Sequence, residues 1–308
     1  MKTRKNHKNN NNKINNTHKP PCIKKLNKSK KKLIKLGCSP NVTHNKEYTC
    51  YSKSSLIKLK NLWNERHPDL LIESNDDREI WKSLKDYMTD VCDVEKCWLK
   101  QNFIKDKLTD ELKNYTFLPE TPKKWKTNKN EWLNSLDIER VMKQYEKKHN
   151  DFEFLGPSPI DFNKHLSDDN CVWDELCNFD LQEKILKSKS NIGIIFNTDP
   201  HYLGGSHWIS MFIDINNKFI LFFDSTGDNM PKEVKQFIKK IKQQGDNIGI
   251  KFKVYINKKK HQKENSECGM YSLHTIIGLL EKHHDINFYL NNDIPDKNME
   301  KLRQIYFN

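Results

Sequence analysis

The sequence predicts an α+β fold with a mixed central sheet. Four short runs rich in β-branched and aromatic residues predict strands at about residues 192–197, 207–215, 218–224 and 252–256. Two helical patterns accompany them, one from Pro231 to Ile241 and one that starts at Cys268. Strands joined partly by turns and partly by helices are typical of a sheet that helices cover.

The second and third strands form a predicted hairpin. One run begins at His207, Asn216-Asn217 supplies a turn, and the next run ends at Asp224, 17 residues after the histidine. In a tight hairpin the start of one strand lies beside the end of the next. We therefore expect His207 and Asp224 to be neighbours.

The two helices are predicted from their apolar spacing. Pro231 suits the start of the first helix. The second is apolar at helical intervals and should pack on the sheet, with Cys268 in its first turn. The apolar positions are Val234, Phe237, Ile238 and Ile241 in the first, and Met270, Leu273, Ile276, Ile277 and Leu280 in the second.

His207, Asp224, Gln262 and Cys268 form a candidate site for thiol chemistry. A free thiol with a pKa of about 8.5 is mostly protonated at neutral pH, and both an adjacent imidazolium and a helix N-terminus favour its anion. Asp224 would orient the histidine, while the Gln262 amide and the Cys268 N–H would donate to an oxyanion. A lone histidine or buried cysteine is usually structural, so only the joint pattern carries weight.

These segments resemble the ubiquitin-like-protein protease family, which includes SUMO proteases and the adenovirus endopeptidase. The shared motifs are His207-Trp208, Asp224-Ser225 and the run from Gln262 to Cys268-Gly269, with Glu267 where the family has Asp. The resemblance implies a papain-like/adenain-like cysteine protease core over residues 121–308. It assigns the catalytic roles to these same four residues and requires no metal or organic cofactor.

Upstream, Trp132-Leu133-Asn134-Ser135 resembles the family's Trp-Leu-Asn-Asp motif. The resemblance implies that Trp132 and Trp208 flank a narrow tunnel for a substrate that ends in Gly-Gly. Two indole faces leave room for glycine but clash with a bulky side chain, although both residues could instead be core tryptophans. Ser135 stands where an Asp often holds the ubiquitin-like partner, which argues against SUMO recognition.

Two further segments, 154–162 and 292–303, look closest to polyprotein-processing proteases of large cytoplasmic DNA viruses. The leading hypothesis is thus a thiol endopeptidase that cleaves viral structural polyproteins after Gly-Gly-type sites, in the virion or host cytoplasm. The alternatives are a SUMO or ubiquitin-like isopeptidase, an acyltransferase, and a non-enzymatic nucleic-acid-binding virion protein. His201 lacks a following Trp and a matched Asp, so we interpret it as a loop residue.

The N-terminal region predicts a disordered basic leader over residues 1–52. Residues 1–35 contain 13 lysines and arginines and no acid, while the remaining chain has 41 basic and 41 acidic residues. The leader has too few apolar residues to bury a core. It could bind nucleic acid through phosphate contacts, or it could be a solvated tail.

Residues 53–120 predict a helical arm, with one face formed by Leu56, Leu59, Leu62 and Trp63 and another by Ile80, Trp81, Leu84 and Tyr87. Thr121-Pro122 marks a boundary. A helix from Trp132 to Tyr145 then begins the protease core.

Eight cysteines are present, and their spacings do not match common zinc pairs. The N-terminus shows no secretory apolar region, and no apolar run approaches the length of a membrane span. We therefore expect reduced thiols in a chain that is not secreted and has no membrane partner.

Overall fold

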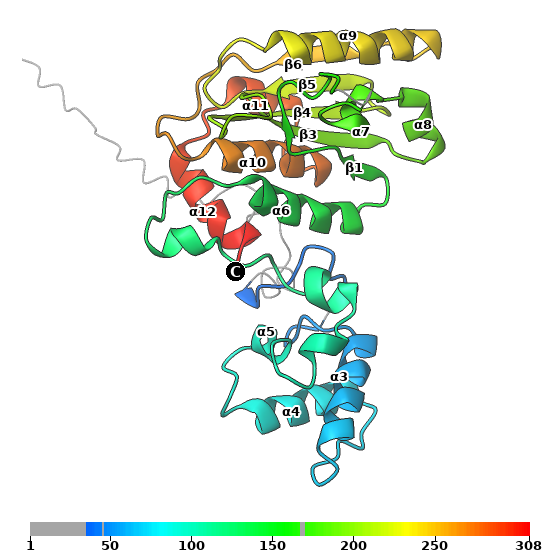
Figure 1. Ribbon diagram of the computed structural model, residues 1–308, viewed down its shortest axis with the longest axis vertical. Coiled ribbons are helices and arrows are strands. Elements are labelled where there is room, and N and C mark those ends of the chain that lie inside the picture. The colour runs from blue at the N-terminus through cyan, green and yellow to red at the C-terminus, as the bar shows by residue number, and fades with distance from the viewer. Residues whose placement is uncertain (1–34, 45, 167–169) are drawn as a thin grey trace, which may run out of the picture.

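The computed structural model describes residues 35–44, 46–166 and 170–308. A mixed six-stranded sheet lies between two helical layers, and a helical body sits at one end (Figure 1). The α+β prediction with a mixed central sheet is confirmed. Most of the predicted leader, residues 1–34, lies outside the described residues.

The sheet has the order β1-β3-β4-β5-β6, with β2 beside β3. Its strands are β1 (Phe152–Phe154), β2 (Ser158–Pro159), β3 (Asn191–Asn197), β4 (Trp208–Asp214), β5 (Phe219–Phe223) and β6 (Lys253–Ile256). β3, β4 and β5 form an antiparallel meander. β1 and β2 each pair with β3 in parallel, and β6 pairs with β5 in parallel. The four predicted strands agree with these bounds to within a residue. β1 and β2 are too short to show a period in the sequence.

Strand alternation divides the core into two layers. On β3, Ile192, Ile194 and Phe196 face one side of the sheet and Ile195 faces the other. Gly193 also faces that other side, where an added Cβ would lie 2.8 Å from Ile276. The missing side chain therefore lets the helix after Cys268 lie directly on the sheet.

One face of the sheet is covered by α6 (Ser135–Lys148), α10 (Cys268–Leu280) and α12 (Asp296–Tyr306), with α11 (Ile286–Asn291) nearby. The other face is covered by α7 (Asp174–Cys177), α8 (Leu181–Leu186) and α9 (Lys232–Asn247). All residues of α10 are buried, as its apolar pattern predicts. α9 extends six residues beyond the predicted end at Ile241, and Gly249 follows it with a φ of 77°.

The helical body contains α3 (Lys53–Arg66), α4 (Asp77–Met88) and α5 (Glu95–Trp98), followed by the short turns η1 (Lys105–Lys107) and η2 (Glu111–Tyr115). It has its own apolar cluster, which includes the predicted positions on α3 and both Ile80 and Leu84. Tyr87 is 40% exposed, but its ring stacks on Trp63 of α3 with the ring centres 5.2 Å apart, so it lies on the predicted packed face.

Residues of the stretches 36–44 and 46–51 also pack into this body, although we predicted a disordered leader up to residue 52. Cys38, Cys50 and Tyr51 are buried in the same cluster. The backbone of residues 37–39 bonds to Thr116 and Leu118. Our prediction overlooked that this stretch carries apolar and cysteine residues that the helical body can bury.

The expectation of reduced thiols is wrong for six cysteines. The structure contains the disulfides Cys38–Cys50, Cys92–Cys97 and Cys171–Cys177. Their Cα atoms are 5.2, 5.5 and 6.2 Å apart, within the range that a disulfide requires. We argued from the lack of a secretory segment, which says nothing about which cysteines the fold brings together. Among the described residues, no helix is long and apolar enough to cross a membrane.

Candidate active site

The β4–β5 hairpin brings His207 and Asp224 together. His207 directly precedes β4, and Asp224 directly follows β5. Ser210, near the start of β4, pairs with Phe223, the last residue of β5, so the start of β4 lies beside the end of β5. His207 Nε2 lies 2.8 Å from Asp224 Oδ1, as the hairpin argument predicts.

Cys268 approaches the same histidine from the helical layer. It is the first residue of α10, is 1% exposed, and alone has a free thiol among the described cysteines. α10 packs on β4, which places the Cys268 side chain close enough to His207 to raise the pKa of the imidazole. Because Nε2 faces Asp224, Nδ1 is the ring nitrogen left for the sulfur. The imidazole therefore lies between a carboxylate and a thiol.

The charges of this group support one another. Burial alone lowers the pKa of His207, but its hydrogen bonds to Asp224 and Cys268 and their charges raise that pKa to about 10. Burial disfavours the ionised Asp224, yet His207 and Thr226 hold the pKa of its carboxyl below the usual value. At neutral pH His207 is therefore an imidazolium, the form that stabilises an adjacent thiolate.

Gln262 is buried and held by Ser225, the residue after Asp224. Ser225 Oγ donates to Gln262 Oε1 over 2.7 Å, and the Gln262 N–H donates to the Ser225 carbonyl over 2.9 Å. Gln262 Nε2 donates to the Glu264 carbonyl over 2.6 Å, which leaves a second amide hydrogen. Asp224 thus holds His207, and the next residue, Ser225, holds Gln262.

Sequence reasoning missed two residues that support Asp224. Thr226 donates to Asp224 Oδ1 from its N–H and hydroxyl, over 2.9 and 2.8 Å. The fully buried Asn257 donates to the Asp224 carbonyl over 2.6 Å and to Lys259 over 2.9 Å. Asn257 directly follows β6, and a polar residue at the end of a strand was the available signal.

The two tryptophans differ in exposure. Trp208 is buried and donates from Nε1 to the Leu133 carbonyl over 2.9 Å, whereas Trp132 is 38% exposed. A Cβ on Gly269 would lie 3.2 Å from Leu133 and 3.3 Å from Trp208. Gly269 therefore packs closely against both residues, with little space for a side chain.

Other candidate groups lie elsewhere. His201 occupies a loop and contacts Asp161 over 2.7 Å. The ligand atoms of His165, Cys171 and Cys177 lie within 4.8 Å of one another, but the two sulfurs are joined as a disulfide. They are therefore not available together as thiolate ligands.

A cleft of about 780 Å³ separates the arm from the core, and Trp132 lies at its edge. Neither His207 nor Cys268 lines it. Its basic side chains are mostly matched locally, as in the ion pairs Lys100–Glu120 and Arg140–Asp137. The cleft therefore does not contain the thiol site, although Trp132 is among the residues that line it.

Known proteins support a protease assignment. Residues 158–308 match the Ulp1 protease family, C-terminal catalytic domain. A protein of Acanthamoeba polyphaga mimivirus described as a thiol protease is 28% identical over 290 residues, covering 88% of this chain and 92% of that protein. A cysteine protease of African swine fever virus is 28% identical over 131 residues, covering 41% of this chain and 48% of the viral protein.

The crystal structure of the African swine fever virus protease has a TM-score of 0.65 to this chain at 20% identity, covering 88% of this chain and 95% of that one. The likeness shows a shared fold over most of this chain. The chain is a cysteine-type peptidase. Residues 158–308 form a Ulp1-like protease domain, and the two viral relatives are described as thiol or cysteine proteases.

Proposed function

We propose that this chain is a thiol endopeptidase that matures viral structural polyproteins by cleavage after Gly-Gly-type sites. Cys268 is the nucleophile, His207 the base and acid, Asp224 the residue that orients His207, and Gln262 an oxyanion donor. The observation that carries the proposal is the position of His207 between Asp224 and the free thiol at the start of α10.

The proposed reaction has two steps. The Cys268 thiolate attacks the scissile carbonyl carbon, and the Cys268 N–H and the second Gln262 amide hydrogen stabilise the oxyanion. The His207 imidazolium gives its proton to the leaving amine, which leaves an acyl-enzyme. Neutral His207 then takes a proton from the water that attacks the thioester, and Cys268 leaves as a thiolate, which restores the imidazolium and thiolate of the first step.

Specificity for glycine would come from the two tryptophans. The bond from Trp208 to the Leu133 carbonyl links them, because Leu133 directly follows Trp132. We expect a peptide with Gly-Gly before the scissile bond to be cut, and a peptide with Val in the final position to lose about 100-fold or more in kcat/KM.

A peptide series assayed with wild type and Trp132→Ala measures this discrimination. Trp132→Ala should reduce the preference for Gly over Val, because one wall is lost. Leu186→Ala is a control, since Leu186 is 78% exposed on the opposite helical layer. Equal turnover of Gly and Val peptides by wild type would refute the tunnel.

The substrate class is proposed from the relatives. The mimivirus protein is described as a thiol protease, and African swine fever virus proteins as cysteine protease or SUMO-1 cysteine protease. We infer action in the virion or host cytoplasm on a viral polyprotein. The SUMO-1 description also keeps a ubiquitin-like isopeptidase as a second candidate. Mass spectrometry of products from candidate polyproteins and SUMO-linked proteins distinguishes the two.

We also propose three units: a basic leader, an arm at about residues 53–120, and a core from residue 121 to 308. The separate apolar cluster of residues 38–117 supports the arm, and extends it toward residue 36. The arm could hold substrate or a partner, or simply cover the core.

The leader is proposed to bind nucleic acid. Deletion of residues 1–35 removes 13 basic side chains, so affinity for a DNA or RNA oligomer should fall at least about tenfold at low salt. Binding by the full chain should weaken steeply with added salt, while turnover of a short peptide stays nearly unchanged. A full-length control with the leader lysines changed to Gln should behave like the deletion. Unchanged affinity for the DNA or RNA oligomer in both variants would refute a binding role, and the leader would then be a solvated tail.

A further inference from the structure

A short irregular loop connects two residues of the proposed catalytic group. Residues 263–267 separate Gln262 from Cys268, and none of them lies in a helix or strand. Glu267 directly precedes α10, yet its side chain makes no capping bond to that helix. The loop therefore takes its shape from other contacts, and these come from α12.

The first residue of α12 holds the start of the loop. Asp296 Oδ2 accepts the N–H groups of Lys263 and Glu264, over 2.9 and 3.0 Å. Its Oδ1 accepts the Tyr271 hydroxyl over 2.8 Å, which ties the same carboxylate to α10. The Glu264 carbonyl in turn accepts the Gln262 amide. Asp296 thus fixes the peptide that orients the proposed oxyanion donor.

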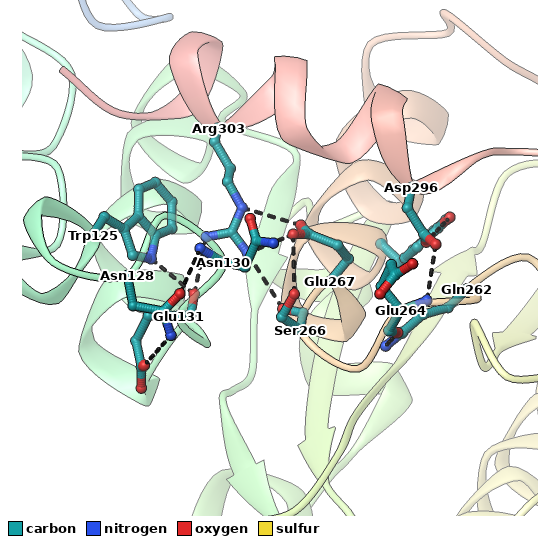
Figure 2. Close-up of polar contacts among 11 residues, drawn as sticks. Trp125, Asn128, Asn130, Glu131, Gln262, Glu264, Ser266, Glu267, Asp296 and Arg303 are labelled. Carbon is teal, nitrogen blue, oxygen red and sulfur yellow. Dashed lines mark hydrogen bonds and ion pairs between the residues drawn. The ribbon is translucent and has the colours of Figure 1, made fainter.

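Arg303, two turns further along α12, holds the end of the loop (Figure 2). Its Nη2 and Nε donate to the two carboxylate oxygens of Glu267, over 2.9 and 3.1 Å, and Nη2 also reaches the Ser266 carbonyl over 3.3 Å. Arg303 and Glu267 are 6% and 2% exposed. The guanidinium neutralises a carboxylate that would otherwise lie next to the nucleophile and oppose a thiolate.

The same guanidinium reaches the segment before Trp132. Arg303 Nη1 donates to the Glu131 carbonyl over 2.9 Å, and Trp125 Nε1 donates to that carbonyl over 2.8 Å. The guanidinium also lies over the Trp125 ring, 4.2 Å from its centre. Figure 2 shows Arg303 between Trp125, Glu131 and Glu267. The Arg303 side chain therefore links the residue before Trp132 to the residue before Cys268.

We propose that Asp296 and Arg303 are positioning residues, which together hold loop 262–268 so that Gln262 and Cys268 face the same reacting carbonyl. The proposal rests on the catalytic roles proposed above. A buried ion pair is by itself weak evidence for stability. Asp296 holds the backbone at the start of the loop, and Arg303 holds the Glu267 side chain and the Ser266 carbonyl at its end. The loop is thus held next to both Gln262 and Cys268, which is the arrangement that positioning requires.

Asp296→Ala tests the first contact. We expect kcat to fall about 10- to 100-fold with KM within about twofold, since the oxyanion donor is displaced and substrate contacts are not. Alkylation of Cys268 by iodoacetamide should keep its rate. Asp296→Asn should recover most of the activity, because an amide oxygen still accepts both N–H groups. Glu300→Ala, an exposed acid on the same helix, should match wild type.

Arg303→Lys tests the second contact. An ammonium keeps the charge but cannot form the fork to Glu267 while reaching Glu131. We expect kcat/KM to fall about 100-fold, with slower alkylation of Cys268 and a raised KM, because both the nucleophile and the Trp132 segment shift. Lys297→Met, an exposed cation on α12, is the control.

If Arg303→Lys unfolds, the double variant Glu267→Gln with Arg303→Met tests the role of Arg303 instead, because it removes both buried charges together. We expect it to fold, with a Tm near wild type, and to remain slow. A folded double variant with wild-type kcat would overturn the proposal for Arg303, and wild-type kcat in Asp296→Ala would overturn it for Asp296. Activity in Cys268→Ala would instead refute the catalytic site itself.

Discussion

Replacement of Cys268 by alanine is expected to abolish peptide hydrolysis, with a loss of about 10,000-fold or more in kcat. No other described cysteine has a free thiol, so no neighbouring sulfur can take over the attack. The fold should remain intact, because alanine keeps the Cβ and the first turn of α10. The loss is therefore chemical and not structural.

Hydrolysis of a Gly-Gly peptide, with the Tm of each variant, measures this expectation. Cys22→Ala is the matched control, since Cys22 lies in the proposed leader outside the catalytic motifs. It should be fully active and as stable as wild type. Full activity in Cys268→Ala, with the expected mass confirmed, would remove Cys268 from the mechanism.

The proposed catalytic group could be predicted because it depends on local topology. A short turn fixes how a hairpin folds back, and here four residues join β4 to β5, so His207 and Asp224 had to meet. The strong apolar period of α10 likewise fixed where its first residue, Cys268, would lie. These contacts follow from short stretches of chain.

The supporting contacts could not be predicted, because they join distant segments. Asn257 reaches the Asp224 carbonyl across 33 residues, and Arg303 reaches Glu131 across 172. Periodicity within one element does not state which elements pack together. We did not predict the three disulfides for the same reason, because their formation depends on how far apart the cysteines lie in the folded chain.

Removal of the imidazole is expected to cost far more than neutralisation of its carboxylate partner. His207→Ala takes away both the base and the acid, so kcat should fall about 10,000-fold or more, as for Cys268→Ala. The loss of kcat in Asp224→Asn should be about 100-fold smaller than in His207→Ala, because the amide oxygen can still accept the imidazole N–H and orient the ring. His201→Ala and Asp246→Asn are the controls, as a loop histidine and an exposed aspartate.

The pH dependence of kcat/KM provides a second, independent readout. Asp224 and Cys268 together raise the pKa of His207 to about 10, so the imidazolium is lost only as the pH rises through that value. In Asp224→Asn the carboxylate charge is gone while burial, which lowers the pKa of His207, remains. The alkaline limb should therefore move to lower pH, and profiles measured from about pH 6 to 10.5 would show it. An unmoved alkaline limb, or a loss in Asp224→Asn equal to that in His207→Ala, would contradict an orienting role for Asp224.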